Sequence, residues 1–487
     1  MRNVLMIITL IAFSMMSVCV PAQTEDDPFA AGESLMVDFI NQLHADPEGT
    51  AASFDLDPAA VRKVLAVEDD TAVEPISAVA SNAILQWAAA ERMDDLLQEC
   101  CYASEGADDR SLSRRFADAG YMAIDTGELT GIVAFANFIE PDTAVRILFK
   151  EMLRKELAIE ETESPALLNG AFEDVGVALG SGTVTLERHT YNVYAAVCHF
   201  GTRPDEAERE FLNLVNQARV SPLAVATARG VDAAGLVMDR PDLINIFEEG
   251  LPPVTFDARL YEAARGHTED MLEHGYVGHD SWDGRTFEDR LWNAGYTAID
   301  AEEAVDKACH CVCVEPKDRA EQFFNRLFMK EMGAGTVPED MMILGGAFTD
   351  AGTAMRAGIN ADLGGICGDE VVLFTTAFGA EEVRPDSVSH LSGVVYRDVN
   401  ENGLYDAGEG DNAAVTVTDT AGTVDTVYSD ETGYFTFPCE SGDYAISVQT
   451  ADGGAVQPQA VTVSGDRVQI FVSVPALPEE GDDADNM

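Results

Sequence analysis

The stretch HTEDMLEHGYVGHDSWDGRTFEDRLWNAGY, residues 267–296, is the most informative segment of the chain. It starts within a run of helical periodicity that begins after Asp257, and Gly275 is placed to end that helix. Its last residues begin the heptapeptide AGYTAID at 294–300, which matches AGYMAID at 119–125. The offset between the two is 175 residues, so the segment belongs to a unit that occurs twice.

The same offset relates many other positions of the two halves. It pairs Asn41 with Asn216, Leu85 with Leu260, Asp95 with Asp270, Arg115 with Arg290, Glu156 with Glu331 and, after a slip of one residue, 170–174 with 346–350. This period is far too long for a solenoid repeat. It predicts two copies of one globular domain, at residues 33–203 and 205–382.

Each copy has helical patterns followed by strand patterns. In the second copy, helices are expected at 206–219, 257–274 and 323–332, and a β-rich apolar run covers 371–378. Helices followed by strands indicate a layered α+β domain. Because the chain holds two such copies, the expected fold is multidomain.

The second copy contains a series of motifs in a specific order and spacing. They comprise Asn216, Arg219, 251–253, Asp257, Leu260, Ala263, Ala264, His267, Asp270, Met271, 275–279, Phe287, Arg290 and 294–296. In these residues it resembles the CAP superfamily, the cysteine-rich secretory, antigen 5 and pathogenesis-related (SCP-like) domains, in its bacterial form. The resemblance covers residues 205–382 and reaches residues 33–203 only through the repeat. It implies an α-β-α sandwich with a surface cleft.

In that family the cleft often holds two His and two Glu, sometimes around a divalent metal. The resemblance places His279 and Glu303 at two of these positions, while the later histidine motif is replaced by other residues at 324–331. His279 is then either a hydrogen-bonded cleft histidine or a contact to a ligand or weakly bound divalent cation. His267 and His274 are expected to be structural or exposed.

The first copy carries less of this site. The offset maps His279 onto Ser104, and the glutamate is retained as Glu128. A carboxylate without a histidine is a poor metal site, so this copy is interpreted as a structural or partner-facing domain.

An all-β sandwich is expected at residues 388–474, from strand patterns at 392–396, 414–418, 434–437, 444–448 and 468–472. Between the first two strands, DVNENGLYDAGE at 398–409 has the spacing of a calcium loop. The expected ligands are Asp398, Asn400, Asn402, the Leu404 carbonyl, Asp406 and Glu409. The alternative is an acidic turn without an ion.

This module resembles the B-type domains of serine–aspartate-repeat adhesins, which are similar to collagen-adhesin B domains. Residues 393–409 and 429–437 carry the resemblance. Some relatives form a Lys–Asn isopeptide bond, but no lysine follows Lys330 in this chain. Calcium would therefore supply the rigidity of the module, and 475–487 would form an acidic disordered tail.

The N-terminus and the charge predict an exported protein. Residues 1–22 have the pattern of a signal peptide, with a lipidated Cys19 as the less favoured alternative, and no later apolar run suits a membrane span. The 487 residues include 30 Lys+Arg and 86 Asp+Glu, so binding to nucleic acid or anionic membranes is not expected.

Nine cysteines are present, and removal of Cys19 leaves an even number. An exported chain with paired cysteines favours disulfides. The close spacing of Cys309, Cys311 and Cys313 leaves a soft-metal site as an alternative.

Two classes of function remain open. The first is a secreted, extracellular or periplasmic binding, scaffold or adhesion protein, with an unknown protein, peptide, lipid or glycan as its partner. The second is a secreted hydrolase of protease-like type, with His279 as base or ligand and Glu303 as its partner. No common hydrolase motif is present, which favours binding over catalysis.

Overall fold

The computed structural model describes residues 29–68, 71–99, 111–158, 165–186, 189–310, 314–333, 341–345, 348–360, 362–364, 370–381, 389–451, 453–463 and 467–475. The chain divides into two compact units, Met1–Arg203 and Pro204–Met487. The expected signal peptide and the acidic residues 476–487 lie outside the described residues.

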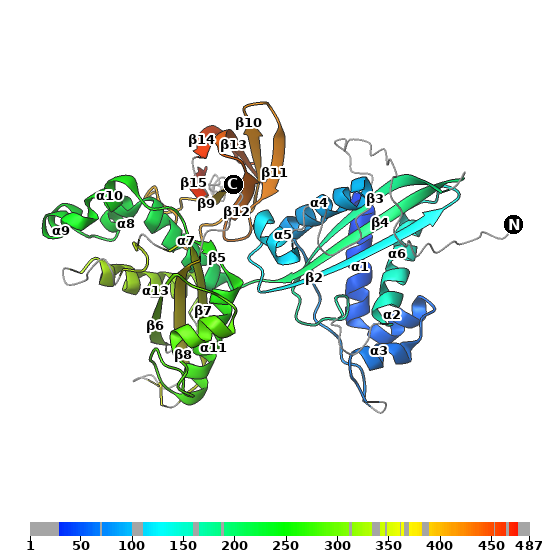
Figure 1. Ribbon diagram of the computed structural model, residues 1–487, viewed down its shortest axis with the longest axis horizontal. Coiled ribbons are helices and arrows are strands. Elements are labelled where there is room, and N and C mark those ends of the chain that lie inside the picture. The colour runs from blue at the N-terminus through cyan, green and yellow to red at the C-terminus, as the bar shows by residue number, and fades with distance from the viewer. Residues whose placement is uncertain are drawn as a thin grey trace, which may run out of the picture. The chain divides into compact units, whose positions relative to one another are not determined.

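The first unit combines helices with a four-stranded sheet (Figure 1). Its elements are α1 (Ala30–Ala45), α2 (Pro47–Ser53), α3 (Pro58–Val64), β1 (Ala80–Ser81), α4 (Ala83–Glu99), α5 (Leu112–Ala119), β2 (Asp125–Phe135), α6 (Pro141–Glu156), β3 (Asp174–Leu186) and β4 (His189–Thr202). The strand order is β1-β3-β4-β2, with β4 antiparallel to both of its neighbours.

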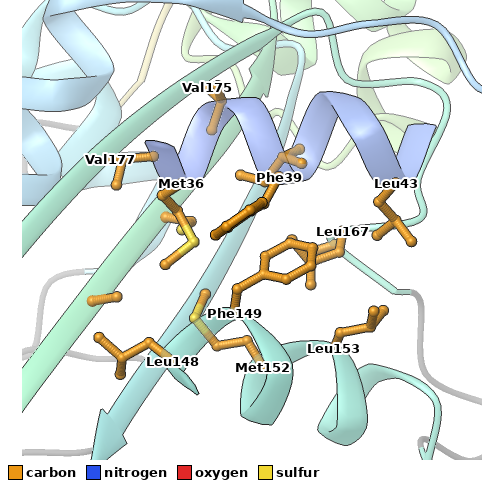
Figure 2. Close-up of a cluster of buried hydrophobic side chains, with 14 of the residues drawn as sticks. Met36, Phe39, Leu43, Leu148, Phe149, Met152, Leu153, Leu167, Val175 and Val177 are labelled. Atoms are coloured by element: carbon orange, nitrogen blue, oxygen red, sulfur yellow. The ribbon is translucent and has the colours of Figure 1, made fainter. Parts of the chain in front are cut away.

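The two faces of this sheet are buried under different helices. Figure 2 shows Val175 and Val177 of β3 directed toward Met36 and Phe39 of α1, with Phe149 of α6 in the same cluster. The residue that follows Val177 on β3, Ala178, instead packs in a cluster with Ala89 and Met93 of α4. Successive side chains of a strand point to opposite faces, so both faces are apolar.

The second unit begins with an equivalent set of elements. These are α7 (Glu206–Val220), α8 (Pro222–Ala228), α9 (Ala233–Asp239), η1 (Pro241–Leu243), α10 (Ile244–Glu249), β5 (Thr255–Phe256), α11 (Ala258–His274), α12 (Phe287–Asn293), β6 (Asp300–His310), α13 (Pro316–Glu331), β7 (Asp350–Gly358) and β8 (Glu370–Ala380). The strand order β5-β7-β8-β6 matches that of the first unit.

Local sequence explains the ends of the predicted helices. The Asp257 carboxylate accepts hydrogen bonds from the backbone N–H groups of Arg259 and Leu260, and Gly275 ends α11 with φ +70°. α13 begins seven residues before its predicted start, because Pro316 occupies its first turn.

The C-terminal region is rich in strands. They are β9 (Ser389–Arg397), β10 (Ala413–Asp419), β11 (Val424–Tyr428), β12 (Tyr434–Cys439), β13 (Gly442–Thr450), β14 (Ala455–Val463) and β15 (Arg467–Val474). They form two sheets, ordered β11-β10-β13-β14 and β12-β9-β15. Separate sheets and a β-rich C-terminal region agree with the predicted multidomain α+β character of the chain.

Equivalent hydrogen bonds recur in the two units. The Asn41 side chain exchanges two hydrogen bonds with the Val79 backbone, at 3.1 and 2.9 Å, and Asn216 does the same with Val254, at 2.9 and 2.8 Å. Both pairs are separated by the 175-residue offset. The buried tyrosines Tyr121 and Tyr296 likewise each donate to an aspartate, Asp174 and Asp350.

Within the second unit, α7 is buried between the sheet and the C-terminal strands. Arg209 forms ion pairs with Asp430 at 2.7 Å and with Glu431 at 2.6 Å. One turn later, the Asn213 amide donates to the backbone carbonyl and the hydroxyl of Thr432. The outward face of α7 is thus a docking surface for the β-rich region.

The described cysteines Cys198, Cys309 and Cys439 are all free thiols. The disulfides expected from the sequence therefore do not form at these three positions, and burial raises the pKa of Cys198 to about 12. The remaining cysteines, Cys19, Cys100, Cys101, Cys311, Cys313 and Cys367, lie outside the described residues, so disulfide or metal binding by Cys311 and Cys313 stays a prediction.

Across the part of the chain that the structure describes, no helix is both long and apolar enough to cross a membrane.

Candidate ligand cleft

A buried carboxylate organises the candidate site of the second unit. Glu303 lies on β6 and its side chain is only 2% exposed. One of its oxygens accepts a hydrogen bond from Arg290 of α12, and the other lies 3.1 Å from Nδ1 of His279. The structure thus brings together the two residues that the family resemblance singled out.

His279 is the accessible member of this group. Its side chain is 63% exposed, and the hydrogen bond to Glu303 raises its pKa above the usual imidazole value. When Nδ1 donates to the carboxylate, the neutral ring carries its lone pair on Nε2. A carboxylate–histidine pair of this kind presents a base or ligand atom of fixed tautomer.

Arg290 holds the loop that carries His279. Its side chain is 4% exposed, and it donates to the His279 carbonyl at 2.9 Å and to the Ser281 hydroxyl at 3.1 Å. The ion pair with Glu303 and these loop contacts share one guanidinium. The position of His279 is therefore fixed by β6, α12 and its own loop together.

His267 of α11 also lies in this site, which the sequence did not predict. It is fully buried, its Nε2 donates to the Gly278 carbonyl at 2.7 Å, and the same atom lies 4.0 Å from Glu303. Burial lowers its pKa, so this ring is neutral at pH 7. The sequence signal was its place on the same helical face as the core residues Ala264 and Met271.

An aromatic side chain borders the same loop. Trp282 is 66% exposed, and its ring stacks on His274 with a centroid distance of 5.0 Å and an angle of 16°. The Asp270 carboxylate fixes this corner by accepting hydrogen bonds from the Trp282 N–H and the Tyr276 hydroxyl. His274 thus supports an exposed ring, which combines the structural and exposed roles expected for it.

The group around Glu303 fits a divalent metal poorly. Arg290 and His279 each take one oxygen of Glu303, and His267 uses Nε2 for a backbone carbonyl. Among the described residues, no three His, Cys, Asp or Glu side chains are placed to hold a metal ion. The exposed His279 ring can form hydrogen bonds with a ligand and can exchange a proton with it.

The first unit has a different arrangement around the matching glutamate. Glu128 lies opposite His199 in the register of β2 and β4, with 3.0 Å between Oε2 and Nε2. Arg92 and Arg115 lie 3.5 Å from the same oxygen. His199 is fully buried and burial lowers its pKa.

This histidine corrects the expectation that Glu128 has none beside it. The repeat comparison missed His199 because it comes from the strand opposite Glu128 instead of the position of His279. Ser104, the residue at that position, lies outside the described residues.

The predicted calcium loop at 398–409 is described throughout. The Asn400 and Asn402 amides both donate to Oδ2 of Asp406, each at 2.6 Å. Asp398 accepts hydrogen bonds from the backbone N–H groups of Asn402 and Gly403. Two amide side chains of the loop thus meet at Asp406, while Asp398 binds the backbone of the loop.

Two further features of this loop suit a hard cation. Gly403, at the sixth position, has φ +77°, the sharp turn that such loops require. Exchange of the oxygen and nitrogen of the Asn400 and Asn402 amides would turn two more oxygens toward Asp406. Glu409 closes the loop, because it accepts hydrogen bonds from the N–H groups of Val399 and Asp406. The spacing and the turn of the loop suit Ca²⁺, whereas the carboxylates of Asp398, Asp406 and Glu409, all in the described part of the chain, are not grouped as a metal-binding set.

The two histidines of the cleft should titrate in opposite directions. We expect the pKa of His279 to lie above, and that of His267 below, the ordinary value of about 6.5, as NMR titration of the ring protons would measure. The stabilisation of the folded protein by the protonated His279 is fully present below the pKa that this residue has in the unfolded chain. It is lost as the pH rises through the pKa that the residue has in the folded protein. Stability from the neutral His267 is present above its unfolded pKa and is lost as pH falls through its folded one.

A Glu303→Gln variant separates the two causes. It should return the pKa of His279 toward the ordinary value, and His267 should stay low because burial dominates its shift. An unchanged pKa of His279 in this variant would contradict the assigned hydrogen bond.

Comparison with known proteins identifies one family in the second unit. The model of the cysteine-rich secretory protein family (CAP) matches residues 212–338. Among solved structures, an extracellular protein containing an SCP domain from Bacillus anthracis str. Ames is similar, with 15% identity over 41% of this chain and a TM-score of 0.21. The similarity spans 60% of that protein's length. No curated protein matches the chain. The chain therefore contains a CAP (SCP) domain at residues 212–338.

Proposed function

We propose that the chain is a secreted ligand-binding or scaffold protein, and that the cleft around His279 contacts its extracellular ligand. The observation that carries this proposal is an exposed imidazole held by a carboxylate that is itself buried and clamped by Arg290. A fixed, exposed polar group and the exposed ring of Trp282, three residues further along the same loop, suit recognition of a ligand.

We also propose that the first unit is a degenerate CAP-like copy with a structural or partner-facing role. The recurring strand order and the equivalent hydrogen bonds of Asn41 and Asn216 support a duplication. Its glutamate is paired with a fully buried histidine, so no exposed imidazole is available at Glu128.

Binding screens against peptide, lipid and glycan arrays, made with the mature chain, test the proposed function. His279→Ala should reduce binding at least about tenfold with only a small fall in the melting temperature, because the side chain is mostly exposed and its ion pair contributes little. His189→Ala, an exposed histidine of the first unit, serves as the matched control. Equal binding by both variants would contradict a role for the cleft.

The alternative is a secreted hydrolase, which the His279–Glu303 pair favours as a base for activating water. Within the described ranges, no hydrogen bond joins the His279 ring to a hydroxyl or thiol that could serve as a nucleophile. Turnover of casein or of a simple ester by the wild-type chain, lost in His279→Ala, would favour this alternative over binding alone.

For the C-terminal region we propose a B-type β-sandwich stiffened by one Ca²⁺ in the loop 398–409. The ligands would be Asp398, Asn400, Asn402, the Leu404 carbonyl, Asp406 and Glu409. The convergence of these side chains on one short loop supports the proposal.

Calcium should raise the melting temperature of the full chain. Extracellular calcium modules have dissociation constants of about 10⁻⁴–10⁻³ M, so a few millimolar calcium should add about 1–2 kcal/mol, or about 2–6 °C. Differential scanning fluorimetry with calcium and with chelator measures the shift. Asp398→Asn and Glu409→Gln should abolish it, whereas Asp425→Asn on β11, outside the loop, should retain it.

The calcium-dependent shift, not the absolute melting temperature, is the informative quantity. Glu409 is largely buried and accepts two backbone hydrogen bonds, so its replacement destabilises the loop even without calcium. A wild-type chain whose melting is the same in calcium and in chelator would establish the acidic turn instead.

A further inference from the structure

A groove of about 760 Å³ opens in the second unit, away from the residues of the His279 cleft. Three segments line it: residues 220–228 at the end of α7 and along α8, residues 247–250 at the end of α10, and residues 402–404 at the tip of the loop 398–409. The CAP domain thus supplies two walls and the β-rich region supplies the third.

Residues 402–404, the third wall, belong to a loop that also contacts the CAP domain. Those contacts are made by Ala407 and Gly408, in the second half of the loop. The Gly408 N–H donates to Glu210 of α7 at 3.0 Å, and the Ala407 backbone donates to Glu321 of α13. Glu210 is 1% exposed, so this contact is fully enclosed. The loop tip is therefore held in place beside α8 and α10 by the protein itself.

The lining combines apolar surface with negative charge. Leu223, 46% exposed, and Leu404 contribute apolar side chains, and Phe247 closes the floor. Glu248 and Glu249 are exposed in the last turn of α10, where the carbonyl groups of the helix end add further negative potential.

None of the described residues that line the groove carries a positive charge. Residues 220–250 hold two arginines against five Asp and Glu residues, and the loop 398–409 holds four acidic residues and no basic one. Arg229 is engaged with Glu321 and Asn325, and Arg240 with Asp242.

We propose that this groove binds an extended peptide segment in which a large apolar side chain stands next to lysine or arginine. The volume lies within the range of ligand sites, and most of the lining is accessible, which suits a chain crossing the groove better than an enclosed small molecule. The apolar side chain packs on Leu223, Phe247 and Leu404, and the cation pairs with Glu248 or Glu249. Opposite charges then set the specificity and the rate of association.

The test is fluorescence anisotropy of the full chain with a labelled hexapeptide of alternating leucine and lysine, at about 0.15 M salt and a fixed calcium concentration. The hexapeptide of alternating leucine and glutamate should not bind. Glu248→Gln/Glu249→Gln should weaken binding of the lysine peptide about fivefold to tenfold, as loss of two exposed ion pairs predicts.

Because the whole chain is acidic, nonspecific attraction needs its own control. Glu262→Gln/Glu269→Gln changes the net charge equally on α11, outside the groove, and should leave the affinity within about twofold. Leu223→Ser and Leu404→Ser should each weaken binding at least about threefold, and Leu404→Ser keeps the backbone carbonyl of the loop.

Equal weakening by both glutamate pairs, unchanged affinity of the two leucine variants, or no binding of the lysine peptide at about 1 mM would overturn the proposal. None of the variants touches the His279 cleft, so the result is independent of the ligand proposed there.

Discussion

Arg219→Met should destabilise the second unit by at least about 3 kcal/mol. The Arg219 side chain is buried, and it donates hydrogen bonds to the backbone carbonyls of Pro252, Ile343, Gly345 and Phe348 at 2.7–3.1 Å. Methionine fills most of the volume but donates nothing, so buried carbonyl groups lose their partners, each at a cost of about 1–3 kcal/mol. That is a large part of the 5–15 kcal/mol typical of a domain.

Urea denaturation of the full chain, followed by circular dichroism and by tryptophan fluorescence, measures the change. Trp282 and Trp292 report on the second unit and Trp87 on the first. Arg265→Met is the control, because Arg265 pairs with Glu262 at the surface of α11 and should contribute less than about 1 kcal/mol. A midpoint for Arg219→Met equal to that of this control would contradict the role assigned to the arginine.

The first unit shows what replaces this arginine. The 175-residue offset maps Arg219 onto His44, whose ring nitrogens lie 2.6 Å from the Ser77 carbonyl and 2.8 Å from the Leu167 carbonyl. Ser77 corresponds to Pro252 at the same offset, and Leu167 to Ile343 after the one-residue slip. An imidazole thus spans two of the carbonyl positions that the guanidinium spans. Arg219→His should therefore retain part of the stability that Arg219→Met loses.

The sequence predicted those parts of the fold whose signals are local. The caps Asp257 and Gly275 bound α11 as expected, because a carboxylate at an N-cap and a left-handed glycine act within one helical turn. The strands β11 and β14 were missed because both are edge strands. β14 contains Pro458, which an edge strand tolerates but which argues against a strand in the sequence.

Only those residues of the candidate site that belong to an ordered series of family motifs could be predicted from the sequence. His279 and Glu303 came from the family resemblance, and the structure brings them to 3.1 Å. His267 and His199 were missed because their approach to a glutamate depends on how α11 packs over the sheet, against β7 and β8, and on the register of β2 with β4. Neither relation follows from spacing along the chain.

Arg209→Met should detach the β-rich region from the CAP domain, at a cost of about 3–5 kcal/mol. Arg209 is 4% exposed and its partner Asp430 is 5% exposed, so removal of the guanidinium leaves a buried carboxylate without its ion pair. Asp430 also accepts hydrogen bonds from the Thr432 N–H and hydroxyl and from the Tyr434 N–H. These hydrogen bonds hold the Asp430 side chain in place, so it cannot turn to solvent when the guanidinium is removed.

The position of this pair in the repeat argues that it serves docking and not the fold of the CAP domain. At the matching position of α1 stands Ser34, which is exposed, and Asn213 is matched by the exposed Asp38. The two helices otherwise share their buried contacts to the sheet, as Glu33 and Glu208 accept hydrogen bonds from the equivalent N–H groups of Leu179 and Met355. The residues that differ are those that face the C-terminal strands in the second unit.

Differential scanning calorimetry of the full chain distinguishes docking from folding. In the wild-type chain, the CAP domain and the β-rich region should melt in one transition, and in Arg209→Met the β-rich region should melt separately at lower temperature. Arg209→Met/Asp430→Asn should recover part of the loss, because the neutral amide removes the uncompensated charge. Two wild-type transitions whose temperatures are both unchanged by Arg209→Met would mean that the ion pair does not couple the domains.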